Sequence, residues 1–160
     1  MFQVVFAVLA VVAASIHLAV SPARRSNRRA VAATYLLYLL VIYVGLMGLL
    51  TAYAHVFRPM QTSASIGWST SPYEYEVGMA DLTVGVLGIC CLWLRGNFWL
   101  ATAIANSVWL LGDAVGHIRQ MVLNSNHAAN NSGIFLITEI TMPLVILLLA
   151  IYVHMKPRGV

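Results

Sequence analysis

The acidic residues of this chain are the side chains best suited to chemistry, because all of them lie inside apolar segments. Each carboxylate placed in hydrocarbon costs at least about 2.5–3.5 kcal/mol on insertion scales. Such acids must hold protons, bind a cation, pair with a histidine or arginine, or line a water-filled cavity. The sequence contains five of them: Glu74, Glu76, Asp81, Asp113 and Glu139.

A histidine joins these acids at a useful spacing. His117 lies four residues after Asp113, so on a helix the two side chains can serve one ion or share one proton. Carboxylates with one imidazole suit iron, manganese or zinc, and such sites between bundle helices can carry oxygen or hydrolytic chemistry. The first hypothesis is therefore a transition-metal site, and whether it supports an enzyme stays open. Its candidate ligands are Glu76, Asp81, Asp113, His117 and Glu139.

Other titratable residues are weaker candidates. Glu74 follows Ser71 and Pro72 at the spacing of a helix capping box, which predicts that its carboxylate is occupied by the cap. His55 and His127 are predicted at the outer surface, where they could extend the acidic cluster.

The segment around Asp113 also predicts how these side chains are presented. At about 100° per residue, its polar residues form one stripe that must face the interior of a bundle. The alternative for Asp113 with His117 is a structural ion pair that ties helices together. Small residues beside these acids predict close packing against other helices. The supporting stripe residues are Thr102, Asn106 and Gln120, and the packing glycines are Gly78, Gly85, Gly112 and Gly116.

The elements that position these residues follow from composition. The chain is 61% hydrophobic and 9% charged, with mean hydropathy +0.84, which excludes a soluble globule. A spanning helix needs about 20 mostly apolar residues, and five runs satisfy this: about 2–20, 30–56, 73–94, 98–123 and 133–154. We predict an all-α polytopic helical membrane bundle, one transmembrane domain over 1–160 with five transmembrane helices, multi-pass in the plasma (inner) membrane. The first run lacks a preceding basic stretch and a small-residue cleavage site, which favours a retained anchor.

The basic residues predict the orientation of the bundle. Seven of the nine lie at one end if five helices alternate, namely Arg24, Arg25, Arg28, Arg29, Arg95, Lys156 and Arg158. Only Arg58 and Arg119 lie at the other end. Because basic residues stay on the cytoplasmic side of short loops, the N-terminus is predicted outside and the C-terminus in the cytoplasm. This orientation and the direction of each helix predict that Glu76, Asp81, Asp113 and Glu139 lie at similar depths in the outer leaflet. Contact with the lipid bilayer then explains the net charge of +4, and no nucleic-acid partner is expected.

Three segments carry a resemblance to a known family. Ser-Pro-Tyr-Glu-Tyr-Glu-Val-Gly-Met-Ala-Asp at 71–81, Gly-Asp-Ala-Val-Gly-His at 112–117 and the Asn-rich loop that leads to Glu139 resemble a family of small bacterial polytopic membrane proteins of unknown function. The similarity covers most of Tyr73 to His154. The resemblance implies a helical membrane fold and adds no activity.

Two further hypotheses from other functional classes remain open. The same residues could form a proton relay or cation path in a small transporter, although the sequence has no inverted repeat and only one proline-interrupted helix. Alternatively, the polar stripe specifies helix pairing in a structural or accessory subunit, within a homo-oligomer or a larger membrane complex. Nucleotide, haem and flavin enzymes find no support, because the chain lacks a Gly-rich phosphate loop and a pair of axial histidines at matching depth.

Overall fold

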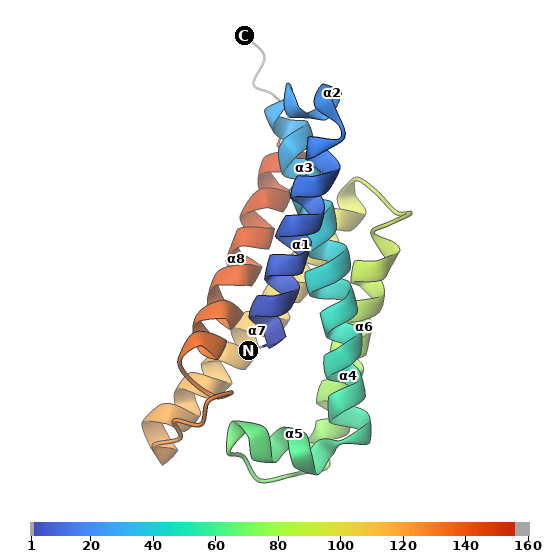
Figure 1. Cartoon of the computed structure of the whole chain (residues 1–160). Coiled ribbons are helices and arrows are strands. Elements are labelled where there is room, and N and C mark those ends of the chain that lie inside the picture. The colour runs from blue at the N-terminus through green and yellow to red at the C-terminus, as the bar shows by residue number, and fades with distance from the viewer. Residues whose placement is uncertain (1, 156–160) are drawn as a thin grey trace.

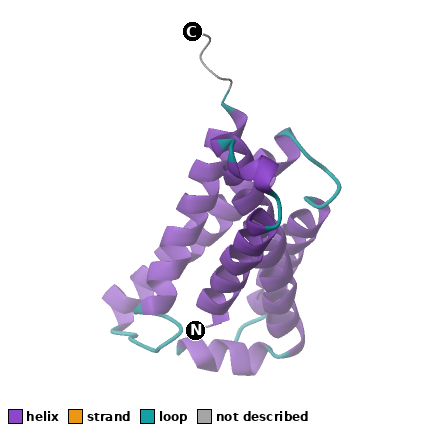
Figure 2. Ribbon diagram, turned by 45° about the horizontal axis from the view of Figure 1, so that its top comes forward, coloured by secondary structure: helices purple, strands orange, loops and turns teal. Residues whose placement is uncertain are grey.

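The computed structural model describes residues 2–155, and within that range the chain consists of helices joined by short loops (Figure 2). The predicted all-helical class is confirmed. In chain order the elements are α1 (Phe2–Ala19), α2 (Pro22–Arg25), α3 (Arg28–Tyr38), the π-helix η1 (Leu39–Leu46), α4 (Met47–Phe57), α5 (Pro59–Ile66), α6 (Tyr73–Cys90), α7 (Asn97–Asn124) and α8 (Ile134–His154).

Four helical stretches are long and apolar enough to cross a membrane. They are α1, the continuous helix Arg28–Phe57 formed by α3, η1 and α4, then α7 and α8. Helix α6 is not among them, because its 18 residues include three acids, Glu74, Glu76 and Asp81. These four helices indicate a membrane protein, and a fifth span through α6 stays a prediction.

The helices form one bundle whose two ends differ (Figure 1). Helix α6 lies along η1 and α4, α7 lies along α8, and α1 packs against α3 and η1. The short helix α2 lies at one end, whereas α5 and the loop between α7 and α8 lie at the other. The core is apolar, with Leu36, Leu40, Tyr43 and Ile146 fully buried.

A seam of glycines brings α6 against the long helix. A Cβ added at Gly88 would lie 2.5 Å from the backbone nitrogen of Gly45, and one at Gly85 would lie 2.8 Å from that of Leu49. A Cβ at Gly78 would lie 2.6 Å from a side-chain methyl carbon of Val56. Only residues without a side chain allow two helix backbones to approach this closely.

The glycines of α7 behave differently. A Cβ added at Gly112 would meet nothing within 4 Å, and one at Gly116 would meet only the Trp68 ring at 3.5 Å. The close helix contact predicted at this pair is therefore not found within residues 2–155. The physical reason is that Gly112 lies on the exposed outer face of α7.

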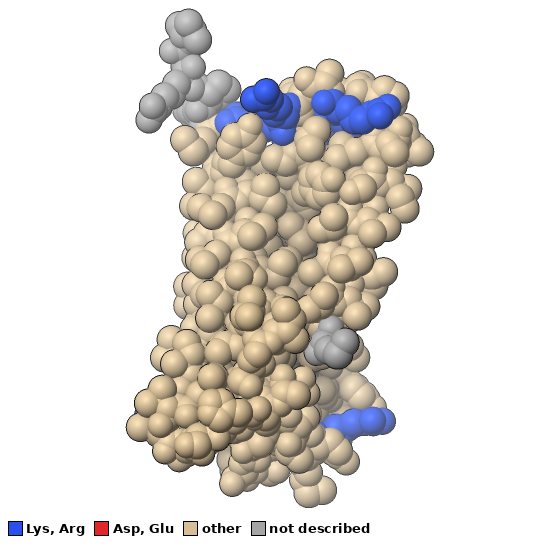
Figure 3. All heavy atoms as spheres, turned by 60° about the vertical axis from the view of Figure 1, so that its left-hand side comes forward, with Lys and Arg blue, Asp and Glu red and all other residues tan. Residues whose placement is uncertain are grey.

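The charged residues also separate the two ends. Figure 3 shows basic side chains gathered at the end that carries α2, with a smaller group at the opposite end. Arg24, Arg25 and Arg28 are exposed there. His154 Nε2 lies 2.6 Å from the carbonyl oxygen of Gly96, which brings the loop containing Arg95 to the same end. Lys156 and Arg158, which contribute to the predicted orientation, lie outside the described residues.

Candidate functional site

A cavity of about 390 Å³ lies in the half of the bundle that contains α5. Residues from α1, the long helix, α5, α6, α7 and α8 line it. Two histidines and four of the five acids are among the lining residues: His55, Glu74, Asp81, Asp113, His117 and Glu139. The predicted ligand Glu76 does not line the cavity, and its side chain is exposed.

Three helices bring the acids to this cavity. Asp81 comes from α6, Asp113 and His117 lie one turn apart on α7, and Glu139 comes from the first half of α8. Asp81, His117 and Glu139 are only 8%, 7% and 3% exposed. Apolar residues complete the wall, including Val44. The acids are thus concentrated in one half of the bundle, as helix direction and spacing predict.

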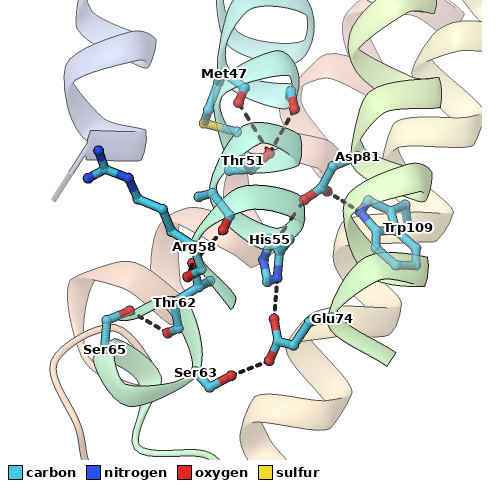
Figure 4. A network of polar contacts seen from close by, with 12 residues as sticks. Met47, Thr51, His55, Arg58, Thr62, Ser63, Ser65, Glu74, Asp81 and Trp109 are labelled. Atoms are coloured by element: carbon cyan, nitrogen blue, oxygen red, sulfur yellow. Dashed lines mark hydrogen bonds and ion pairs between the residues drawn. The ribbon is translucent and has the colours of Figure 1, made fainter. Parts of the chain in front are cut away.

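A polar cluster joins α4, α5, α6 and α7 (Figure 4). His55 Nδ1 lies 2.6 Å from Glu74 Oε2, and the other carboxylate oxygen of Glu74 accepts a hydrogen bond from the buried hydroxyl of Ser63. His55 Nε2 lies 4.0 Å from Asp81 Oδ2, while Trp109 Nε1 donates to Asp81 Oδ1 at 2.9 Å. This cluster fixes α5 across the end of the bundle.

The predicted capping role of Glu74 is corrected by this geometry. Helix α6 begins at Tyr73 with Pro72 at the cap position, and no side chain caps it. The Glu74 carboxylate instead contacts His55 and Ser63. An imidazole and a hydroxyl on neighbouring helices satisfy this carboxylate, which therefore links three helices instead of closing its own.

Asn131 fixes the hydrogen-bonding role of His117. The Asn131 side-chain nitrogen donates to the carbonyl oxygens of Asn126 and His117, at 2.9 and 3.3 Å. The Asn131 side-chain oxygen is therefore the acceptor. It accepts a hydrogen bond from Trp68 Nε1, which can only donate, at 2.8 Å. The same oxygen lies 2.8 Å from His117 Nδ1, so that nitrogen carries a hydrogen. In the neutral ring, Nε2 is then an acceptor, 3.7 Å from Glu139 Oε2.

Two acceptors consequently face each other at the cavity. Glu139 Oε2 is buried and has no hydrogen-bond partner in the part of the chain that the structure describes. Two other side chains that line the cavity, Gln3 and Asn106, also contain a buried polar atom without a partner. Because an unmatched buried polar group costs about 1–3 kcal/mol and a charged one more, the site is incomplete without a proton or a ligand.

The predicted metal ligands do not converge on one point. Across residues 2–155, no group of three or more His, Cys, Asp or Glu side chains is placed to hold one metal ion. Among the described residues, His117 and Glu139 form the one histidine–carboxylate pair of the predicted set in close contact, with Nε2 and Oε2 3.7 Å apart. The transition-metal site therefore stays a prediction. The carboxylates instead lie at separate places around the cavity wall.

The polar stripe of α7 has mixed roles. Thr102 is buried but donates to the carbonyl oxygen of Phe98 at 2.9 Å, and Gln120 accepts from Asn124 at 2.6 Å. Of the three predicted supporting residues, only Asn106 lines the cavity.

Sequence reasoning missed Gln3, Trp68, Trp109 and Asn131. Trp109 lies four residues before Asp113, on the same face of α7, and this spacing could have revealed it. Asn131 lies in a loop, where no periodicity indicates which way a side chain points. Of the two weaker histidine candidates, His55 lines the cavity and His127 does not.

Comparison with known proteins gives one match. A family model described as a family of unknown function (DUF6790) matches residues 1–159. No curated protein and no solved structure matches the chain. The matched range includes every residue of the cavity.

Proposed function

We propose a function for this chain, which belongs to the DUF6790 family of unknown function, from the chemistry of its cavity. The chain is a membrane protein that binds a cation among Asp81, Asp113 and Glu139. The observation that carries this proposal is the unmatched, 97% buried carboxylate of Glu139, whose Oε2 faces the acceptor nitrogen of His117 at 3.7 Å. A cation placed there would satisfy both atoms.

The charges around the cavity support this proposal. Glu74 is matched by His55 and Ser63, but Asp113 makes no hydrogen bond to any described residue. Arg58 is the only arginine among the lining residues, and its side chain is exposed. An uncompensated ion in a low-dielectric interior costs several kcal/mol, so a bound cation would stabilise this arrangement.

We further propose that the cavity faces the outside of the cell. Helix α6 lies along η1 and α4 and acts as the fifth span, and the exposed arginines near α2 place that end in the cytoplasm. The N-terminus and α5 then lie on the outer side of the plasma membrane. The cation would enter from that side.

The identity of the cation separates the remaining hypotheses. Iron, manganese or zinc would use His117 Nε2 and Glu139, with water completing the coordination because the described residues bring no third protein ligand to this pair. A cation-coupled transporter would use the same acids without a fixed metal. Both hypotheses require the Glu139 carboxylate.

Binding to the detergent-purified full chain tests the proposal. Elemental analysis detects a resident metal, and calorimetric titration measures binding of Na⁺, Mn²⁺, Zn²⁺ and primary ammonium salts. We expect at least one cation to bind the wild type, and Glu139→Gln to weaken that binding about tenfold or more, as loss of a charged ligand does. Glu76→Gln removes an exposed carboxylate outside the cavity and serves as the matched control. Wild-type protein that binds none of these cations would refute the proposal, because its acids would then simply hold protons.

A further inference from the structure

We infer that the cation is a small protonated primary amine, an inference that rests on the proposed function and names its ligand class. The cavity contains no cluster of three metal-binding side chains within the described residues. Its acids instead come from three helices and lie around a space of about 390 Å³. Small-molecule sites in proteins measure about 300–1,000 Å³, whereas one water occupies only about 30 Å³. The space therefore fits a small organic ion better than a single bare ion.

The pair of facing acceptors is suited to an ammonium group. Glu139 Oε2 and His117 Nε2 are 3.7 Å apart. A nitrogen donor forms hydrogen bonds of about 2.7–3.2 Å, so one –NH₃⁺ group placed beside the pair reaches both atoms. A primary ammonium has three N–H donors and no acceptor. An alkali cation prefers oxygen ligands and would leave the imidazole nitrogen unmatched.

The supporting hydrogen bonds keep that pair in place. Asn131 is fully buried and accepts from both Trp68 and His117, which holds the acceptor nitrogen of the imidazole toward the cavity. Asn131 is therefore a positioning residue, because it acts on the ligand only through His117.

Two amides extend the pattern of unmatched atoms. Gln3 and Asn106 both line the cavity, and they are only 4% and 2% exposed. Each has a buried polar atom without a hydrogen-bond partner. The unmatched atom is the acceptor Oε1 in Gln3 and the donor Nδ2 in Asn106. A hydroxyl on the ligand both donates and accepts, so it matches either atom while the ammonium group binds the acids.

The rest of the wall suits the carbon skeleton of such a ligand. Trp68, Trp109 and Phe135 line the cavity together with Val44 and Leu110. Aromatic faces attract a cation, and aliphatic side chains cover methylene groups. A hydrated metal ion gains little from these residues. Acids at some points and apolar side chains at others therefore indicate a small amino alcohol or a related amine.

Calorimetric titration with three probes tests this inference on the full chain in detergent. Ethanolamine carries an ammonium and a hydroxyl, ethylamine lacks the hydroxyl, and tetramethylammonium has the charge but no N–H donor. We expect ethanolamine to bind more tightly than ethylamine, and tetramethylammonium to bind at least about tenfold more weakly than either. Glu139→Gln should lose at least about tenfold in ethanolamine affinity, whereas Glu76→Gln should match the wild type.

The controls separate this inference from the proposed function. If Mn²⁺, Zn²⁺ or Na⁺ binds in a Glu139-dependent way and neither amine does, the amine inference is wrong and the cation site stands. If tetramethylammonium binds as tightly as ethanolamine, N–H donation is not the basis of recognition and the inference is overturned. If no cation binds, both proposals fail. Asp113→Asn, at a less buried position, repeats the measurement should Glu139→Gln not fold, and circular dichroism checks the helix content of each variant.

Discussion

Substitution of Gly88 by alanine tests the glycine seam that holds α6 against the long helix. The added Cβ would lie 2.5 Å from Gly45 N, 2.6 Å from Leu40 O and 2.7 Å from Gly45 Cα. All three atoms belong to backbone, so no side-chain rotation relieves the overlap. Carbon atoms pack at about 3.5–4.0 Å, and the helices must therefore separate by about 1 Å.

The expected magnitude follows from a matched pair of variants. Forcing extra atoms into a packed contact costs about 1–3 kcal/mol. Alanine also gains up to about 1 kcal/mol over glycine in helix propensity. Gly112→Ala receives only that gain, because a Cβ there meets nothing within 4 Å. The difference between the two variants therefore isolates the packing cost, and Gly88→Ala should be less stable than Gly112→Ala by about 1–3 kcal/mol.

Unfolding in detergent, followed by circular dichroism during titration with a denaturing detergent, measures this difference. The wild type gives the reference free energy of unfolding. If Gly88→Ala and Gly112→Ala have the same stability within about 0.5 kcal/mol, the backbones of α6 and η1 are not in contact and our reasoning is refuted. A stabilised Gly112→Ala alone leads to no conclusion about the seam.

Two further predictions concern topology and the outer loops. In a background without the native cysteines, Ser65→Cys should react with a membrane-impermeant thiol reagent from outside the cell, and Ser26→Cys only from inside. Labelling of both positions from the same side would rule out the five-span topology. Asn131→Ala leaves the half-buried donor of Trp68 and the buried donor of His117 unmatched, so the free energy of unfolding should fall by about 1–3 kcal/mol, measured by chemical unfolding. An unchanged stability would show that these hydrogen bonds are absent in the folded protein.

Long apolar helices are predictable from this sequence because an apolar segment of about 20 residues can cross a membrane only as a helix or as part of a closed barrel. The predicted run 98–123 becomes Asn97–Asn124, and 133–154 becomes Ile134–His154. The third run ends earlier than predicted, at Cys90, because the chain continues there in turns. In these turns the carbonyl oxygen of Cys91 accepts a hydrogen bond from Trp99 Nε1 at 3.0 Å. Hydropathy does not distinguish an apolar turn from an apolar helix.

Shorter elements were less predictable. Helix α5 has Pro59 at its start and Gly67 at φ 70° after its end, which are ordinary helix boundary signals. Its eight residues are nevertheless too few to show a clear helical period of apolar side chains, so the sequence does not predict this helix. The π-helix η1 has no sequence signal, because its run of apolar residues is equally compatible with an α-helix.

The candidate site was predictable only as far as helical spacing reaches. Asp113 and His117 share a face of α7, and helix direction places Asp81 and Glu139 at the same end of the bundle. The partners of these residues come from loops and from neighbouring helices. The position of Asn131 depends on how one loop crosses the end of the bundle, which no spacing rule describes.

The π-helix η1 determines which way the second half of the long helix faces. Its hydrogen bonds close over five residues instead of four, so the stretch holds more residues per turn than the α3 and α4 segments on either side. Deletion of one residue within 39–46 would rotate α4 by about 100° relative to α3. His55 would then turn away from Glu74, and Gly48 would leave the seam with α6. The extra residue that η1 accommodates thus sets the rotational phase between the α3 half of this helix and its cavity-lining α4 half.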